Sequence, residues 1–156
     1  MNNLCAEIGF RSINHEGEQL CGDHVDVIRQ GENSTVIVLA DGLGSGVKAS
    51  ILSTLTSKII STMMAEGLKL EDCVSTIAAT LPICSVRGVA YSTFTILHLI
   101  ENETVEIIQY DNPSVIFLRD GEVYHQLYRG NMSFEEMFAK VSDTLTMLTT
   151  GGERHA

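Results

Sequence analysis

A strand that ends in an acid and alternating glycines, and that is followed at once by a helix, constrains this sequence most. Residues 35–40 (TVIVLA) are apolar almost throughout and too short for a helix, which predicts a strand buried on both faces. Asp41 comes next, and Gly42, Gly44 and Gly46 follow it. Glycine permits backbone approaches that a Cβ would block. We therefore expect Asp41 to be fixed at a strand end beside accessible backbone carbonyls.

Two helices are expected after the glycines. Apolar residues recur at helical spacing from Val47 onward, which predicts an amphipathic helix that ends near Gly67. A second helix is predicted at residues 71–81, because Pro82 stops its apolar pattern. The apolar face expected for the first helix consists of Val47, Ile51, Leu52, Leu55, Ile59 and Met63.

Short β-branched or apolar runs between turn residues predict strands in the rest of the chain. The Asp120-Gly121 pair is the strongest hairpin signal. Strands before, and hairpins after, the two helices indicate an α+β fold, a sheet layered with helices. The predicted strand pairs are 4–13 with 25–29, 92–100 with 104–110 and 114–119 with 122–127. In the last segment, residues 134–141 have helical spacing while 144–148 favour a strand, and we favour a strand pair that turns near 142–143.

Composition excludes several classes of protein. The chain has 10 Lys and Arg against 20 Asp and Glu, a net charge of −10 that disfavours nucleic acid as a partner. Four cysteines without CxxC spacing exclude a zinc knuckle and a thioredoxin-like motif. The sequence shows neither a signal segment nor a long apolar run, so we expect a soluble, cytoplasmic protein that does not bind membranes.

The glycine motif does not fit the common phosphate-binding loops. A dinucleotide site needs G-x-G-x-x-G with an acid about 20 residues later, but here the acid comes first. A P-loop needs Lys directly after Gly, whereas Val47 separates Gly46 from Lys48. Asp41 could be merely a cap or turn residue. A second carboxylate, Asp23, lies upstream, and its convergence with Asp41 would favour a cation such as Mg²⁺ or Mn²⁺.

The Gly22-Asp23 pair, followed by an apolar strand that ends in Asp-Gly-x-Gly-x-Gly and opens a long helix, resembles the SpoIIE-type serine/threonine phosphatases of the protein phosphatase 2C family. The segment YDNPSVIFLRDGEV, residues 110–123, extends the resemblance, which covers about residues 5–151. It implies a layered α-β-β-α sandwich of mostly antiparallel strands with helices outside. It also implies that Asp23, Asp41 and the Gly42 carbonyl hold Mn²⁺ or Mg²⁺, two ions in an intact site, and that Asp23 and Asp41 are catalytic.

Two departures from the family pattern bear on activity. Thr150 stands where the family has a metal-binding Asp, and the sequence stops at Ala156, before the family's closing helix, strand and last Asp. We therefore expect residues 1–156 to form a single, C-terminally incomplete domain with weak or mononuclear metal binding, unless Asp111 or Asp143 substitutes. The missing strand would expose a sheet edge, through which the chain could self-associate.

The resemblance leaves two functions open. One is a metal-dependent phosphatase that uses a metal-activated water on phosphoserine or phosphothreonine in a regulatory protein of the anti-sigma factor antagonist type. The other is a catalytically inactive or truncated relative that acts as a protein-binding regulatory module. Further residues are expected to be structural: His24 in an exposed loop, His98 on a sheet face, Lys48 on a helix surface and Arg87 in a loop.

Overall fold

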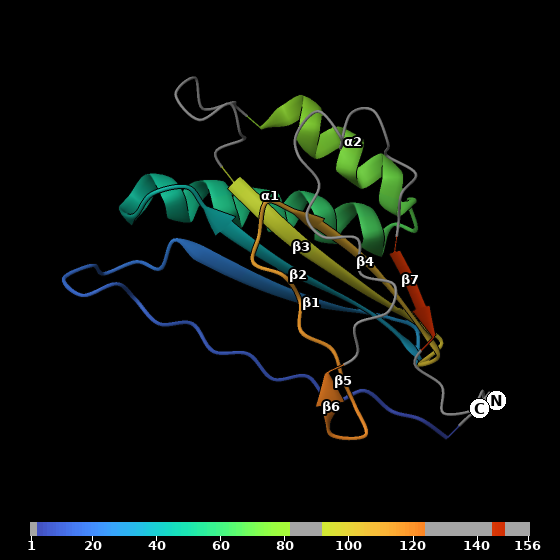
Figure 1. The fold of residues 1–156 in the computed structure, drawn as a ribbon. Coiled ribbons are helices and arrows are strands. Elements are labelled where there is room, and N and C mark those ends of the chain that lie inside the picture. The colour runs from blue at the N-terminus through green and yellow to red at the C-terminus, as the bar shows by residue number, and fades with distance from the viewer. Residues whose placement is uncertain (1–2, 82–91, 124–144, 149–156) are drawn as a thin grey trace.

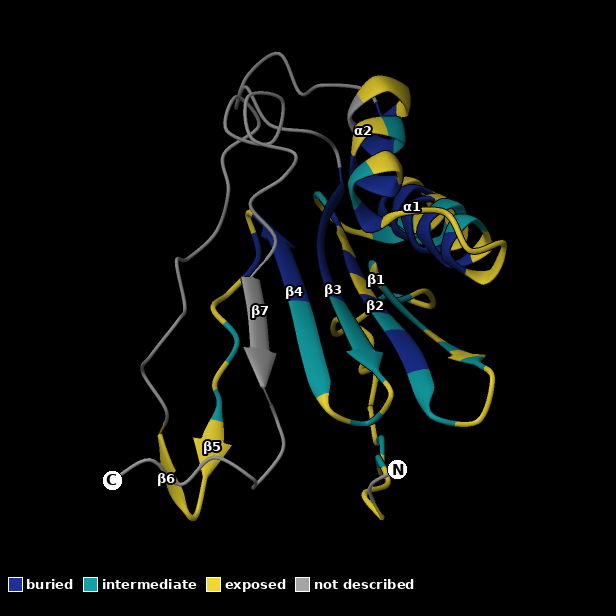
Figure 2. Cartoon of the chain, turned by 90° about the vertical axis from the view of Figure 1, so that its right-hand side faces the viewer, coloured by how far each residue is buried: buried dark blue, intermediate teal, exposed yellow. Residues whose placement is uncertain are grey.

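The computed structural model describes residues 3–81, 92–123 and 145–148. Its main sheet has five antiparallel strands in the order β1-β2-β3-β4-β7. Both described helices lie on one face of this sheet (Figures 1 and 2). The elements are β1 (Asp23–Gln30), β2 (Ser34–Gly42), α1 (Gly46–Ala65), α2 (Leu70–Thr80), β3 (Ser92–Ile100), β4 (Thr104–Tyr110), β5 (Leu118–Arg119), β6 (Glu122–Val123) and β7 (Leu145–Leu148).

The first hairpin differs from its prediction. Residues 4–13 form no strand, and β1 pairs with β2 across the turn at Gly31. Gly31 has a φ of 67°, a left-handed conformation that glycine adopts without strain. The apolar residues of the N-terminal segment lack a neighbouring strand, so Phe10 and Ile13 remain exposed. The pairing of residues 4–13 with residues 25–29 was therefore wrong, whereas the strand expected at 25–29 is present within β1.

The remaining hairpins lie close to where the sequence predicts them. Strands β3 and β4 match residues 92–100 and 104–110 and are antiparallel partners. Strands β5 and β6 turn at Asp120-Gly121, where both residues have positive φ, and within the described residues each strand is two residues long. Strand β7 lies within the predicted 144–148 and pairs with β4. The turn expected near residues 142–143 is outside the described residues.

Helix α1 packs on the sheet through a face that its apolar pattern does not predict. The buried face carries small or hydroxylated residues together with a few apolar ones: Ala49, Leu52, Ser53, Thr56, Ser57, Ile60, Ser61 and Met64. Val47, Ile51 and Leu55 are instead 62%, 60% and 44% exposed. The helix bounds are confirmed within two residues of the prediction, whereas half of the expected core face points away from the sheet.

The hydrophobic core lies between the helices and one face of the sheet. Val36, Val38 and Ala40 on β2 are fully buried and contribute to it with α2 and β3 residues. Leu39 points to the opposite face and is 41% exposed, so β2 is not buried on both faces as expected. The α+β architecture with antiparallel strands is confirmed. Of the expected sandwich, the described residues supply one large sheet and one helix layer.

Among the described residues, neither helix combines the length and the hydrophobicity needed to cross a bilayer.

Candidate metal centre

Asp23 and Asp41 are neighbours at one end of the sheet. They are Cα partners in the β1–β2 ladder, so their side chains leave the same face, the one opposite the helices. Partial burial raises the pKa of Asp41 to about 6, and a hydrogen bond to Asp23 and the negative charge of Asp23 add to this rise. Two carboxylates that share a proton in this way form a donor set that a cation can occupy instead.

The glycines of the motif let α1 lie directly on the end of β2. A Cβ at Gly42 would lie 2.7 Å from the Cα of Ala49 and closer still to the Ala49 carbonyl. The Gly42 amide donates to the Gly22 carbonyl at 2.9 Å and extends the β1–β2 pairing. A Cβ built on Gly22 would lie 3.7 Å from the Gly42 carbonyl oxygen and 3.6 Å from that of Gly44. These two backbone oxygens therefore lie beside the residue that precedes Asp23.

The residues fit one hard cation better than two. Two carboxylates with nearby carbonyl oxygens are the ligand type that Mg²⁺ and Mn²⁺ prefer. Within the described ranges, however, no group of three or more His, Cys, Asp or Glu side chains is placed to hold a metal ion. Asp111 has a φ of 50° at the end of β4, and it does not join the pair in such a group. Asp143, Thr150 and Arg87 lie outside the described residues.

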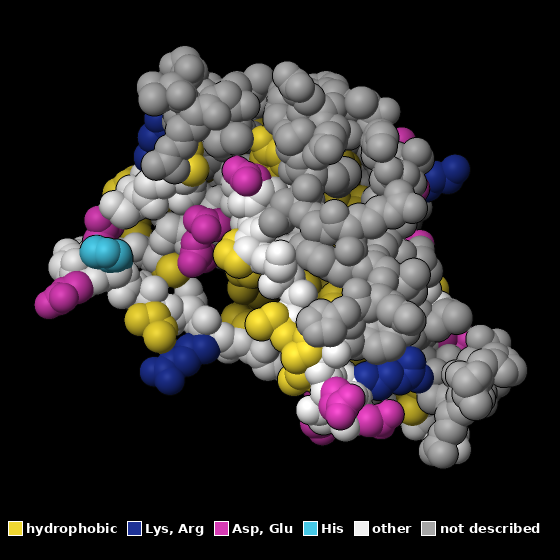
Figure 3. All heavy atoms as spheres, in the orientation of Figure 1, with side chains coloured by type: hydrophobic (Ala, Val, Ile, Leu, Met, Phe, Trp, Pro, Cys, Tyr) yellow, Lys and Arg dark blue, Asp and Glu magenta, His cyan; other side chains and the backbone are white. Residues whose placement is uncertain are grey.

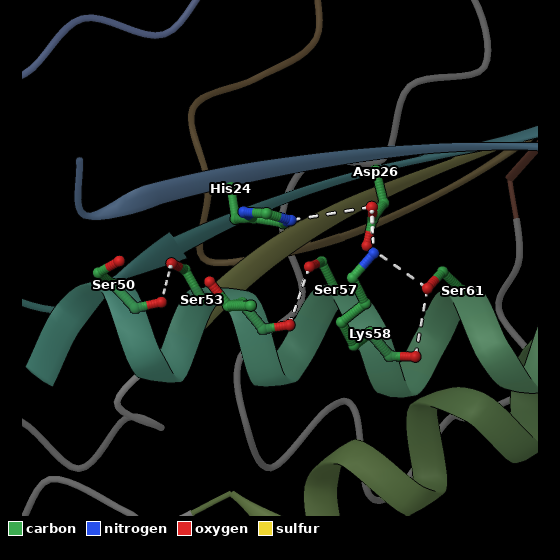
Figure 4. A network of polar contacts seen from close by, with 8 residues as sticks. His24, Asp26, Ser50, Ser53, Ser57, Lys58 and Ser61 are labelled. Carbon is green, nitrogen blue, oxygen red and sulfur yellow. Dashed lines mark hydrogen bonds and ion pairs between the residues drawn. The ribbon is translucent and has the colours of Figure 1, made fainter. Parts of the chain in front are cut away.

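His24 belongs to a different site. It lies in β1, not in a loop as expected, and adjacent strand residues point to opposite faces, so it faces α1 while Asp23 does not. Its Nε2 is 3.8 Å from Asp26 Oδ1, and Lys58 Nζ is 2.8 Å from the same oxygen (Figure 4). Burial alone would raise the pKa of Asp26, but the hydrogen bond and charge of Lys58 lower it overall. This network attaches α1 to β1.

Two other side chains are placed as the sequence predicts. His98 lies on the helix-side face of β3, where its ring nitrogens contact Glu106 at 3.3 Å and Gln30 at 3.0 Å. Lys48 is exposed on the first turn of α1. Neither residue lies on the face that carries Asp23 and Asp41.

A buried polar network on the carboxylate face was not predicted from the sequence. Thr93 is the Cα partner of Asp41 in the β2–β3 ladder, and its hydroxyl donates to Asn112 Oδ1. Thr95 and Gln109 continue the network. These residues belong to β3, β4 and the segment after β4, and no local motif marks them. Only the register of the sheet brings them next to Asp41.

The face of the molecule that carries β1 and the segment after β4 is hollowed. Figure 3 shows hydrophobic side chains lining this hollow, with Asp and Glu side chains on the same face.

The chain matches the sequence profile of one protein family over most of its length. The family is described as stage II sporulation protein E (SpoIIE), and the match covers residues 31–142, which include Asp41 and Gly42 but not Asp23. None of the curated proteins compared with the chain matches its sequence.

Several solved structures have a similar fold, and one of them is a phosphatase domain. The phosphatase domain of SpoIIE from Bacillus subtilis, with a fragment of its regulatory domain, has a TM-score of 0.64 at 18% identity and covers 73% of this chain. RsbX in complex with magnesium has a TM-score of 0.61 at 18% identity and covers 90% of this chain. The RsbU and RsbW domains of a Mycobacterium tuberculosis protein reach 0.53 at 18% identity over 65% of this chain.

At these identities the likeness shows a shared fold. The alignments span only part of each known structure: 34% of the SpoIIE chain, 65% of the RsbX chain and 28% of the Mycobacterium tuberculosis chain.

Proposed function

The chain belongs to the SpoIIE family, and from this premise we propose that it is a metal-dependent phosphatase domain that acts on phosphoserine or phosphothreonine in a protein. One observation carries the proposal: the β1–β2 ladder places Asp23 opposite Asp41 at the sheet end where the glycine loop begins. The family is that of a phosphatase whose domain shares this fold. We take residues 1–156 as one domain of this type.

Asp23, Asp41 and the Gly42 carbonyl would hold the cation, Mn²⁺ or Mg²⁺. The magnesium complex of RsbX, which shares the fold, supports this choice of ion. A bound divalent cation would supply Lewis-acid polarisation of the phosphate and activation of a water molecule. The fold holds the two carboxylates next to each other. The raised pKa of Asp41 shows that deprotonating both of them costs free energy when no cation is bound.

Helix α1 supports binding of an anionic substrate at the same end of the sheet. It begins at Gly46, directly after the glycine loop, without a side-chain cap or an acid in its first turn. Free N–H groups at a helix N-terminus attract anions such as phosphate. The Glu18 carboxylate lies 3.3 Å from the position of a Cβ on Gly46, so a phosphate at this turn would have to displace it.

A specific observation also favours the second candidate, a catalytically inactive family member that binds a regulatory protein. The described residues bring together only two carboxylates, and no third His, Cys, Asp or Glu within those ranges completes a metal-binding group. One weakly held ion, rather than two, would leave the fold intact and the hydrolysis slow or absent.

The proposed partner is a phosphorylated regulatory protein of the anti-sigma factor antagonist type, encountered in the cytoplasm. The structural likeness to RsbU and RsbW domains and to a protein of the bacterial stressosome supports this class of partner. The net charge of −10 disfavours nucleic acid as a competing partner.

The experiment that tests the phosphatase function is hydrolysis of an aryl phosphate over a Mn²⁺ titration. We expect metal-dependent turnover by the unaltered chain and only the background rate for Asp41→Ala, because its carboxylate is half of the cation site. Glu122→Ala removes an exposed acid from β6 and serves as the matched control. No turnover by a folded, unaltered chain would favour the binding module, and full turnover by Asp41→Ala would move the site elsewhere.

A further inference from the structure

Four buried polar side chains form a connected network on the carboxylate face of the sheet. Thr93, Thr95, Gln109 and Asn112 are 6%, 5%, 3% and 3% exposed. Asn112 Nδ2 donates to Thr95 Oγ1 at 3.0 Å, and Gln109 Nε2 donates to the same oxygen at 3.3 Å. Gln109 also donates to the Pro113 carbonyl at 2.7 Å and accepts from the Val115 amide at 3.3 Å. The segment after β4 is therefore held firmly against β3.

One member of this network is adjacent to the candidate metal centre. Asp23 pairs with Asp41 across β1 and β2, and Asp41 pairs with Thr93 across β2 and β3. Directly paired residues lie on the same face, with Cβ atoms about 4.5–5.5 Å apart. The three side chains thus form one row across the sheet. Thr95 lies on the same face but pairs with Leu39, one row away from the carboxylates.

The hydrogen bonds determine which part of the Thr93 hydroxyl can face Asp41. A hydroxyl has one proton and two lone pairs. Thr93 donates its proton to Asn112 Oδ1, and the orientation of the Asn112 amide is set by its donation to Thr95. Thr93 therefore has no proton left for the Asp41 carboxylate, and it offers an acceptor oxygen beside two acceptor groups. Such a set favours a ligand that brings only donors or positive charge.

We propose that Thr93, oriented by Asn112, is a positioning residue that accepts a hydrogen bond from a water molecule of the hydrated cation held by Asp23 and Asp41. Hard cations such as Mg²⁺ usually retain several waters in proteins, and groups that hydrogen-bond to the ligands tune the affinity for the metal. The inference rests on the proposed cation site and assigns a role to a residue outside the carboxylate pair.

The test is Mn²⁺ binding by calorimetry, without any assay of activity. Removing a group that orients metal ligands typically costs 10- to 100-fold in affinity, so we expect Thr93→Val to weaken binding by about 10-fold. Thr93→Ser keeps the hydroxyl and should remain within about threefold of the unaltered chain. Thr35→Val is the matched control, because it removes an equally buried hydroxyl, 4% exposed, from the same face of the sheet at the opposite end of β2 and outside this network, and it should also remain within about threefold.

Each outcome supports or overturns the inference. Unchanged affinity in Thr93→Val, or an equal loss in Thr35→Val, would overturn it and leave the carboxylate site standing. No Mn²⁺ binding by the unaltered chain would overturn the proposed function and this inference together. Should Thr93→Val fail to fold, Asn112→Ala removes the acceptor of the Thr93 hydrogen bond instead. It is expected to weaken Mn²⁺ binding in the same direction, and unchanged affinity in this variant would also overturn the inference.

Discussion

At Gly42 the backbone of α1 passes so close to β2 that no side chain fits. The nearest atoms to a Cβ at this position are backbone atoms of Ala49, which cannot move aside as the tip of a flexible side chain could. The glycine therefore has a packing role that is separate from the metal-binding role proposed for its carbonyl. The motif indicated an unusual backbone at this point, but only the structure shows that the space is filled by the helix itself.

We predict that Gly42→Ala lowers the free energy of unfolding by about 3 kcal/mol, because the helix must move away from the strand. The same movement shifts the loop beside Asp41, so Mn²⁺ affinity should fall as well. Gly9→Ala is the control, since open space surrounds Gly9 and its backbone is not left-handed, and its effect should stay within about 0.5 kcal/mol. Urea unfolding measures both changes. A Gly42→Ala variant as stable as the original would show that α1 can adjust at no cost.

The family resemblance implied that Asp23 and Asp41 serve one metal site, and the β1–β2 ladder brings the two residues opposite each other, although that hairpin was not the one predicted. Thr93 and Asn112 could not be found in this way. Their hydroxyl and amide groups are common, and their proximity to Asp41 depends on the register of β3 and on the chain direction after β4. Non-local pairing of this kind is not encoded in any single segment.

At the scale of elements, α1 shows where periodicity fails. The spacing of Val47, Ile51 and Leu55 correctly predicted a helix but not the face that it buries. The close approach at Gly42 requires small residues where the helix meets the sheet, and Ala49, Ser53 and Ser57 supply them one turn apart. Val47, Ile51 and Leu55 point outward, whereas Leu52, Ile60 and Met64 are bulky residues that do belong to the buried face. The strand predicted at residues 4–13 is absent for a related reason. Apolar and β-branched residues form a strand only where a neighbouring strand can pair with them.

Two isoleucines of α1 test which face is buried. Ile60 is fully buried and Ile51 is 60% exposed. We expect Ile60→Ala to lower the free energy of unfolding by about 3 kcal/mol through loss of buried surface and the cavity left behind. Ile51→Ala, the same substitution on the other face, should cost less than about 0.5 kcal/mol. Chemical denaturation of both variants decides the matter, and equal losses would mean that the outer stripe is also covered in solution.

At the scale of the whole molecule, the two faces of the main sheet have different roles. The helix-side face holds the hydrophobic core and the His98 and Asp26 networks, which join helices and strands. The opposite face carries Asp23, Asp41 and Thr93 at one end of the sheet. The alternation of side chains along a strand thus separates stability from the candidate chemistry. The α+β class and the family could be predicted from sequence, because the order of elements and one glycine motif suffice for both.

The raised pKa of Asp41 links cation binding to pH. Relative to the unfolded chain, this pKa favours the protonated form, so the metal-free fold loses stability as the pH rises from 3.8 to about 6, and the full penalty is present above about pH 6. A bound cation removes that penalty, because it replaces the shared proton. Protons and the cation should therefore compete for the same pair of carboxylates.

The measurement that tests this account most directly is the Mn²⁺ affinity of the unaltered chain and of Asp41→Asn from pH 5 to pH 8, by calorimetry. The account predicts saturable binding above pH 7, an affinity that falls by about tenfold per pH unit below about pH 6, and loss of binding in Asp41→Asn. Binding that does not depend on pH, or that survives in Asp41→Asn, would contradict the assignment of the cation to this carboxylate pair.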